Sequence, residues 1–115
     1  MKETKAGLAA LERRYETLRQ SLARIGYISQ GTVLDRSRLR RPRSGYQWTR
    51  KVKQKTITVS LSPEQFHALK QAVANQHKLW KTIETMEKIS RRILFGTEPD
   101  TRRRKRLSKN VLGTN

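Results

Sequence analysis

Residues 45–62 read GYQWTRKVKQKTITVSLS, and this stretch predicts two short strands joined by a polar turn. Alternate residues of a strand share a face, and burial of one face sets the register of the hairpin. A turn at Lys53 and Gln54, whether it is two or four residues long, would pair Trp48 with Val59. The turn lacks the Asn-Gly or Asp-Gly pair of tight hairpins, so its geometry stays open. One face would then hold the mainly apolar set Tyr46, Trp48, Arg50, Val52, Ile57, Val59 and Leu61.

The other face of the hairpin is predicted to be basic and rich in hydroxyl groups. A two-stranded hairpin is marginal in water, so its apolar face needs a cover. The next residues supply one, because Ser62 suits the N-cap of a helix, Pro63 its first turn and Gln65 the third position after the cap. The polar face would hold Gln47, Thr49, Lys51, Thr56, Thr58 and Ser60.

The helix that starts at Pro63 is predicted to span residues 63–95 and to end at Gly96. Its apolar positions change phase across residues 75–77, which predicts either a kink or two separate helices. Phe66, Leu69 and Val73 form the apolar seam before the phase change, and Leu79, Ile83, Met86 and Ile93 form the seam after it.

An earlier helix is predicted over residues 1–25, with Gly26 as its C-cap. Its apolar residues recur at alternating spacings of three and four, which is the heptad pattern of helix packing. Two interpretations are open: the stripe packs against the second helix of the same chain, or it forms a coiled-coil contact with another copy or a larger protein. The stripe consists of Leu8, Leu11, Tyr15, Leu18, Leu22 and Ile25.

Composition gives the strongest indication of function. The chain has 115 residues, 34% of them hydrophobic, which predicts one small domain with a small core. Its 27 Lys and Arg residues against 9 Asp and Glu give a formal charge of +18. Such an excess repels itself unless a polyanion neutralises it, and it favours nucleic acid over an acidic membrane surface. No stretch approaches the roughly 18 apolar residues of a membrane-spanning helix.

The basic residues are concentrated in two runs. The first run begins at Arg36 and continues to Lys55 without an acidic residue. It begins within residues 27–44, a connection in which residues 32–38 are predicted to add a third strand. The second lies in residues 97–115, a tail that we expect to be disordered alone and to order on a polyanion. Trp48 suits base stacking beside these cations, but we favour it as a core residue. The candidate phosphate ligands are Arg36, Arg38, Arg40, Arg41, Arg43, Arg50, Lys51, Lys53, Lys55, Arg102, Arg103, Arg104, Lys105 and Arg106.

The sequence contains no Gly-rich phosphate loop, no Ser-His-Asp set and no metal-ligand cluster. There is no cysteine, which excludes disulfides and thiolate ligands. His67 and His77 would lie about 15 Å apart along a helix, too far to share a metal. Glu84 and Glu87 lie close to lysines in the sequence, so ion pairs are expected there. We therefore expect no enzyme activity, no cofactor and no metal.

These patterns together predict an α+β fold, with a heptad helix in residues 1–26, a basic connection in 27–44, a hairpin plus long helix in 45–96 and a basic tail in 97–115. Residues 45–94 also resemble a family of short basic bacterial proteins of unknown function, whose genes lie near transposases. The resemblance rests on YQWTRKV from Tyr46, on KTITVSLS from Lys55, and on the helix that follows with its Trp80. It implies a role in a mobile element. Some members carry a cysteine cluster before the hairpin; arginines stand there in this chain, so no metal site carries over.

The expected function is therefore a cytoplasmic, non-enzymatic nucleic-acid-binding protein, an accessory or regulatory protein of a bacterial mobile element that prefers DNA to RNA. The alternative is a small basic subunit of a ribonucleoprotein or transposase assembly, which binds RNA and a larger protein. The two hypotheses differ in what the heptad stripe contacts and in how much of the binding the arginines provide.

Overall fold

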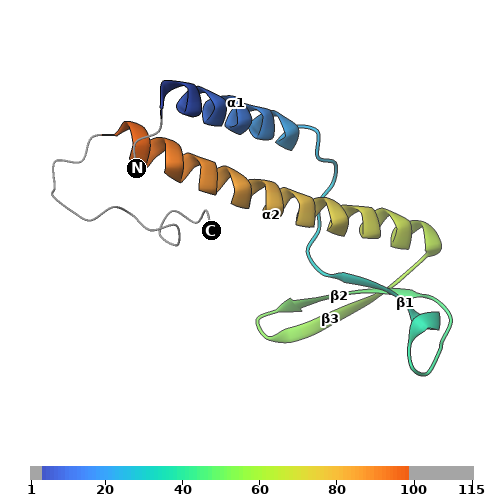
Figure 1. The fold of residues 1–115 in the computed structure, drawn as a ribbon. Coiled ribbons are helices and arrows are strands. Elements are labelled where there is room, and N and C mark those ends of the chain that lie inside the picture. The colour runs from blue at the N-terminus through green and yellow to red at the C-terminus, as the bar shows by residue number, and fades with distance from the viewer. Residues whose placement is uncertain (1–3, 99–115) are drawn as a thin grey trace. The chain divides into compact units, whose positions relative to one another are not determined.

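The computed structural model describes residues 4–98. In order, the chain forms α1 (Lys5–Leu22), β1 (Thr32–Asp35), a short 3-10 helix (Arg36–Arg38), β2 (Tyr46–Val52), β3 (Lys55–Leu61) and α2 (Pro63–Thr97) (Figure 1). This arrangement confirms the predicted α+β class with an N-terminal helix, a small antiparallel sheet and a long second helix. The predicted basic tail lies outside the described residues, apart from Thr97 and Glu98.

The chain divides into two compact units, and α2 contributes to both. The sheet unit is Ile25–Leu79, and the helical unit combines residues 4–24 with residues 80–98. The first half of α2 belongs to the sheet unit and the second half to the helical unit.

The sheet unit contains three antiparallel strands in the order β1-β2-β3. β2 and β3 pair in the predicted register, with Trp48 opposite Val59 and Thr49 opposite Thr58. The predicted third strand is confirmed over Thr32–Asp35, which pairs with the first half of β2. Its last three predicted residues instead form the 3-10 helix, because Asp35 caps that turn through the backbone N–H of Ser37 at 2.9 Å.

The turn between β2 and β3 has two residues. Lys53 and Gln54 have φ angles of 49° and 67°. Positive φ at both central residues is the signature of a type I′ turn, whose twist matches that of the flanking strands. The shorter of the two predicted turns is therefore the one present. Lys53 and Gln54 occupy the two positions that usually hold Asn and Gly.

The start of α2 confirms the predicted capping box. The backbone N–H of Gln65 donates to the Ser62 hydroxyl at 3.1 Å, and the Ser62 N–H donates to the Gln65 side-chain oxygen at 3.0 Å. This cap places Phe66 beneath the sheet, where its ring stacks on Tyr46 with centroids 4.3 Å apart. The buried residues of this unit are Phe66, Ala72 and Val73.

α2 is one continuous helix of 35 residues, so the alternative of two separate helices is wrong. The apolar seam changes phase because the two halves of the helix bury their side chains in different units. The first half contacts the sheet through Phe66, and the second half belongs to the unit that contains α1. Gly96 lies inside the helix, which extends to Thr97, whereas the predicted helix spans residues 63–95.

α1 is shorter than predicted. It starts after the N-cap Thr4, whose side chain accepts the Gly7 N–H, and it ends at Leu22 with Ala23 as C-cap. The prediction that Gly26 caps the helix is wrong, and Ile25 lies beyond the helix. The connection is held instead by α2, since the Asn75 side chain donates to the Tyr27 carbonyl at 2.9 Å and the Ser29 N–H to the Ala72 carbonyl at 3.2 Å.

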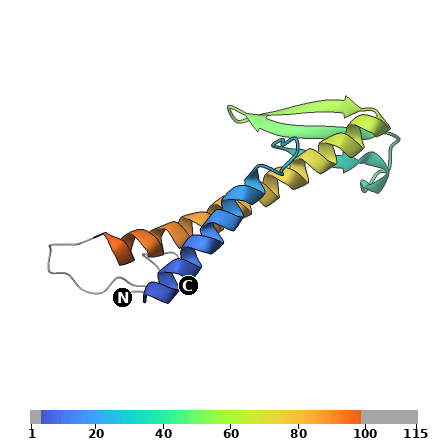
Figure 2. The same cartoon turned by 90° about the horizontal axis from the view of Figure 1, so that it is seen from above.

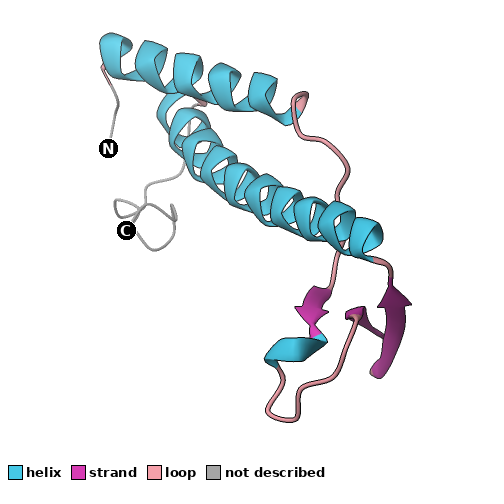
Figure 3. Ribbon diagram, turned by 90° about the vertical axis from the view of Figure 1, so that its right-hand side faces the viewer, coloured by secondary structure: helices cyan, strands magenta, loops and turns pink. Residues whose placement is uncertain are grey.

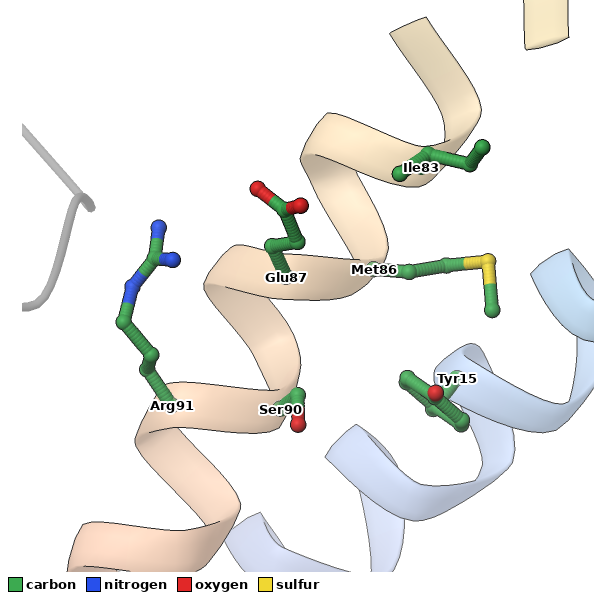
Figure 4. A pocket seen from close by; sticks show the side chains of 6 residues that line it. All are labelled: Tyr15, Ile83, Met86, Glu87, Ser90 and Arg91. Atoms are coloured by element: carbon green, nitrogen blue, oxygen red, sulfur yellow. The ribbon is translucent and has the colours of Figure 1, made fainter. Parts of the chain in front are cut away.

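The helical unit is an antiparallel pair formed by α1 and the second half of α2, which lie side by side in Figures 1 and 2. Its core contains Leu11, Met86 and Ile89, and Ile89 is only 3% exposed. Tyr15 faces a shallow hollow of about 510 Å³ (Figure 4) whose other lining residues are Ile83, Met86, Glu87, Ser90 and Arg91. Within residues 4–98, no helix is long and apolar enough to cross a membrane.

Candidate nucleic-acid interface

Within residues 4–98, charge is distributed unequally between the two units. The sheet unit carries eleven Lys and Arg residues and only two acidic residues, Asp35 and Glu64. The described part of the helical unit carries nine basic and five acidic residues, and it contains the ion pairs Arg19–Glu16 at 2.9 Å and Lys88–Glu84 at 3.7 Å. Among the residues that the structure describes, the excess of positive charge is therefore concentrated in the sheet unit.

The arginine-rich segment between β1 and β2, residues 36–45, forms a loop closed by backbone hydrogen bonds (Figure 3). The N–H of Arg36 donates to the Gly45 carbonyl at 2.9 Å, and the N–H of Arg43 donates to the Arg36 carbonyl at 3.1 Å. These bonds fix both ends of the loop where it leaves the sheet. The closed loop presents Arg38, Arg40, Arg41 and Arg43, all of them exposed.

Arg36 differs from the other arginines of the loop. Its Nε donates to the Gln47 side-chain oxygen at 3.2 Å, and one terminal nitrogen donates to the Ser60 hydroxyl at 2.7 Å. The guanidinium thus spans β2 and β3 on the polar face of the sheet, and the side chain is partly buried. Of the predicted phosphate ligands within residues 4–98, Arg36 is the one whose side-chain donors already bond to other side chains of the fold.

Asp35 stabilises the same loop from the other side. Its carboxylate accepts the Ser37 hydroxyl at 2.7 Å and the Ser37 backbone N–H at 2.9 Å. These bonds, the hydroxyl first, hold the pKa of the Asp35 carboxyl below its usual range, and the nearby Arg38 adds to the effect. Sequence reasoning missed this role, although an Asp two residues before a Ser is a known turn signal.

The second basic cluster is the free end of the hairpin. β1 pairs only with Tyr46–Thr49 of β2, so residues 50–57 form a two-stranded ribbon, which we call the arm. The arm carries four exposed cations and no acidic residue. Its cations are Arg50, Lys51, Lys53 and Lys55.

The loop and the arm lie at opposite ends of β2, as Figure 1 shows. β2 has seven residues, so the two clusters are separated by about 20 Å along the strand. Between the loop and the tip of the arm lies the polar face predicted from the sequence, with Gln47 opposite Ser60, Thr49 opposite Thr58 and Lys51 opposite Thr56. A basic run that is continuous in sequence becomes two positive clusters joined by a row of hydroxyl and amide groups.

Trp48 is held from its edge by the backbone before β1. Its indole N–H donates to the Gln30 carbonyl at 2.9 Å, and the Arg50 guanidinium lies 5.8 Å from the ring centroid. Trp48 is only partly buried and is not among the buried core residues, so the prediction that it belongs to the core is not confirmed. Its ring borders an open apolar groove of about 400 Å³ between sheet and helix, lined also by Ser29, Val59, Leu61, Gln65, Ala68 and Leu69.

The remaining predicted residues fall in two groups. Arg102, Arg103, Arg104, Lys105 and Arg106 lie outside the described residues. The heptad residues of α1 face their own chain: Leu11 is buried, whereas Leu8, Tyr15, Leu18 and Leu22 are partly buried. A contact of this stripe with a second copy or a larger protein stays a prediction. Across residues 4–98, no group of three or more His, Cys, Asp or Glu side chains is arranged to hold a metal ion.

Comparison with protein-family models, with curated proteins and with solved structures gave no match. The resemblance to transposase-associated proteins therefore stays an expectation from residues 45–94 alone.

Proposed function

We propose that this chain is a non-enzymatic nucleic-acid-binding protein, with the sheet unit as its binding surface. The observation that supports this most is the exposure of its charge: ten of the eleven cationic side chains of the unit are exposed, against two acidic residues. A surface of this kind gains free energy by replacing the counterions condensed on a phosphate backbone. DNA is the favoured ligand, and the favoured role is that of an accessory or regulatory protein of a bacterial mobile element in the cytoplasm.

A salt series on nuclease-treated protein tests this proposal. Labelled duplex DNA of about 20 base pairs is titrated by fluorescence anisotropy at NaCl concentrations between about 50 and 200 mM. If six or more phosphates are neutralised, the affinity falls by about a thousandfold or more across that range. Absence of binding to DNA and RNA in dilute buffer, or a slope near zero, would refute the proposal.

A variant with fewer loop charges provides the control. Arg38, Arg40 and Arg41 are changed to Gln together, whereas Arg36 is left because it holds the sheet. Each lost phosphate contact reduces the salt slope by about 0.9, so we expect a decrease of up to about 3. Circular dichroism of the variant should match that of the original protein, since these side chains are exposed.

A second candidate function is that of a small subunit in a ribonucleoprotein or transposase assembly. It draws support from exposed apolar side chains in the helical unit, where Trp80 is 57% and Leu94 is 51% exposed. Side chains of this kind are enriched where proteins meet. Co-elution with the protein encoded by a neighbouring gene, surviving nuclease treatment and lost in Trp80→Ala, would favour this candidate over the first.

A further inference from the structure

We propose that the arm, residues 50–57, enters the major groove of duplex DNA with the polar face of the hairpin toward the base edges. This inference rests on the proposed nucleic-acid-binding function and specifies which nucleic acid is bound and how. It is carried by three features of the arm: its free edges, its width and the chemistry of its polar face.

Within the described residues 4–98, no strand pairs with either outer edge of the arm. β1 stops opposite Thr49, and sheet order places β3 at the other edge, so beyond Thr49 the ribbon has only two strands. A ribbon of this kind is marginal in water, and Ile57 on it is 39% exposed. Four cations on eight residues add repulsion. The arm therefore gains both contacts and charge neutralisation when it enters a groove between two rows of phosphates.

The width of the ribbon selects the groove. Two paired strands have backbones about 4.8 Å apart before side chains are added. The major groove of B-form DNA, about 12 Å wide, admits a two-stranded ribbon, whereas the minor groove is about 6 Å wide. The major groove of A-form RNA is deep and narrow, so side chains cannot reach the base edges there. The arm consequently fits duplex DNA and not duplex RNA.

The polar face suits contact with bases of any sequence. Thr49, Thr56 and Thr58 present hydroxyls, which can donate to or accept from different base edges, and Lys51 is the one cation on that face of the arm. Arg50 and Lys55 are on the opposite face, and Lys53 lies at the tip, where each can reach flanking phosphates. This face has no arginine in the arm for a bidentate contact with guanine, so we expect weak sequence preference.

Blocked grooves provide the test. Affinities are measured for plain duplex DNA, for the same duplex carrying glucosylated hydroxymethylcytosine, which fills the major groove, and for an A·T-rich duplex preloaded with netropsin, which fills the minor groove. We expect glucosylation to weaken binding by about tenfold and netropsin to have little effect, because the arm occupies the major groove. Duplex RNA of equal length should bind more weakly than plain duplex DNA.

Two variants with equal loss of charge separate the arm from the loop. In the arm variant, Lys51, Lys53 and Lys55 are changed to Gln, and Arg50 is kept because it lies over Trp48. In the loop variant, Arg38, Arg40 and Arg41 are changed to Gln. Both should bind more weakly, but only the arm variant should lose its sensitivity to glucosylation.

A further variant, Thr56→Val with Thr58→Val, keeps the charge and the strand preference of the arm. It should lower the affinity for plain duplex several-fold without changing the salt slope, because hydroxyl contacts to bases release no counterions. If the original protein binds plain and glucosylated DNA equally, or if netropsin blocks it instead, the inference is overturned while the proposed function stands. If no nucleic acid binds at all, both are overturned.

Discussion

Arg36 and Arg38 are two residues apart in sequence, yet the fold gives them different surroundings. Arg36 donates to Gln47 and Ser60 across two strands, whereas Arg38 is exposed at the surface of the loop. A count of charges in the sequence treats the two alike. Only the strand register, which brings Gln47 opposite Ser60, shows that one arginine has hydrogen-bond partners within the fold. Hydrogen bonds from a charged donor are about twice as strong as neutral ones, so Arg36 is expected to stabilise the sheet.

Among the described glycines, Gly31 has the closest neighbouring atoms to an added Cβ. Its φ is +108°, and a Cβ there would lie 2.5 Å from Nε1 of Trp48 and 2.6 Å from the Thr49 carbonyl oxygen. We predict that Gly31→Ala lowers the free energy of unfolding by about 3 kcal/mol, because it adds backbone strain and displaces the indole from the Gln30 carbonyl. Urea unfolding followed by circular dichroism measures this change.

Gly45→Ala is the matched control for this prediction. Gly45 also has a positive φ, +96°, but the nearest atom to an added Cβ is a terminal nitrogen of Arg36 at 3.3 Å. The end of a flexible side chain can move, so we expect only the strain, about 1–2 kcal/mol. Equal losses in the two variants would mean that contact with Trp48 contributes nothing.

At the scale of elements, the hairpin turn combines a demanding geometry with two unfavourable residues. Lys53 and Gln54 both have φ near +60°, where residues with a Cβ pay a steric cost. Gln54→Gly removes that cost without changing charge, although glycine also gains entropy in the unfolded chain. We predict a net stabilisation of about 0.5–1 kcal/mol, seen as a higher thermal midpoint. Gln54→Ala shortens the same side chain at the same φ and should not stabilise.

Local patterns predicted elements well because their causes lie within a few residues. The capping box at Ser62 and Gln65 and the alternation of β2 and β3 both follow from neighbouring residues, and both are confirmed. The errors fall where distant residues decide. α1 ends early, and the connection after it is held by Asn75, which lies 48 residues from Tyr27 in the sequence. The phase change in α2 resembles a break in the sequence, because the pattern of one helix does not show that its two halves belong to different units.

The candidate site was predictable in composition but not in arrangement. The sequence indicated which residues are basic, and ten of the eleven in the sheet unit are exposed. It did not indicate that the run from Arg36 to Lys55 divides into a closed loop and an arm about 20 Å apart, since that separation requires the length and direction of β2. The arm is defined by the end of β1 opposite Thr49, and the sequence does not indicate where that pairing ends.

At the scale of the whole molecule, the described parts of the two units differ in their excess of positive charge, so we predict that salt affects the stability of the two units differently. Self-repulsion in the sheet unit, with eleven cations and two acidic residues, should be relieved as NaCl screens it. In the helical unit, salt also weakens the exposed Arg19–Glu16 pair. We predict that raising NaCl from about 20 to about 300 mM raises the thermal midpoint of the sheet unit by about 5 °C and that of the helical unit by less.

The two tryptophans allow this difference to be measured, because Trp48 lies in the sheet unit and Trp80 in the helical unit. In Trp80→Phe, the remaining emission comes from Trp48 and follows the sheet unit, whereas circular dichroism at the helical wavelength follows both. NaCl is preferred to sulfate, since sulfate would strengthen apolar burial in both units and hide the electrostatic effect. A Trp48 midpoint that stays constant with NaCl would show that the cations of the sheet unit do not repel one another appreciably, which would remove the physical reason for expecting a polyanion to bind there.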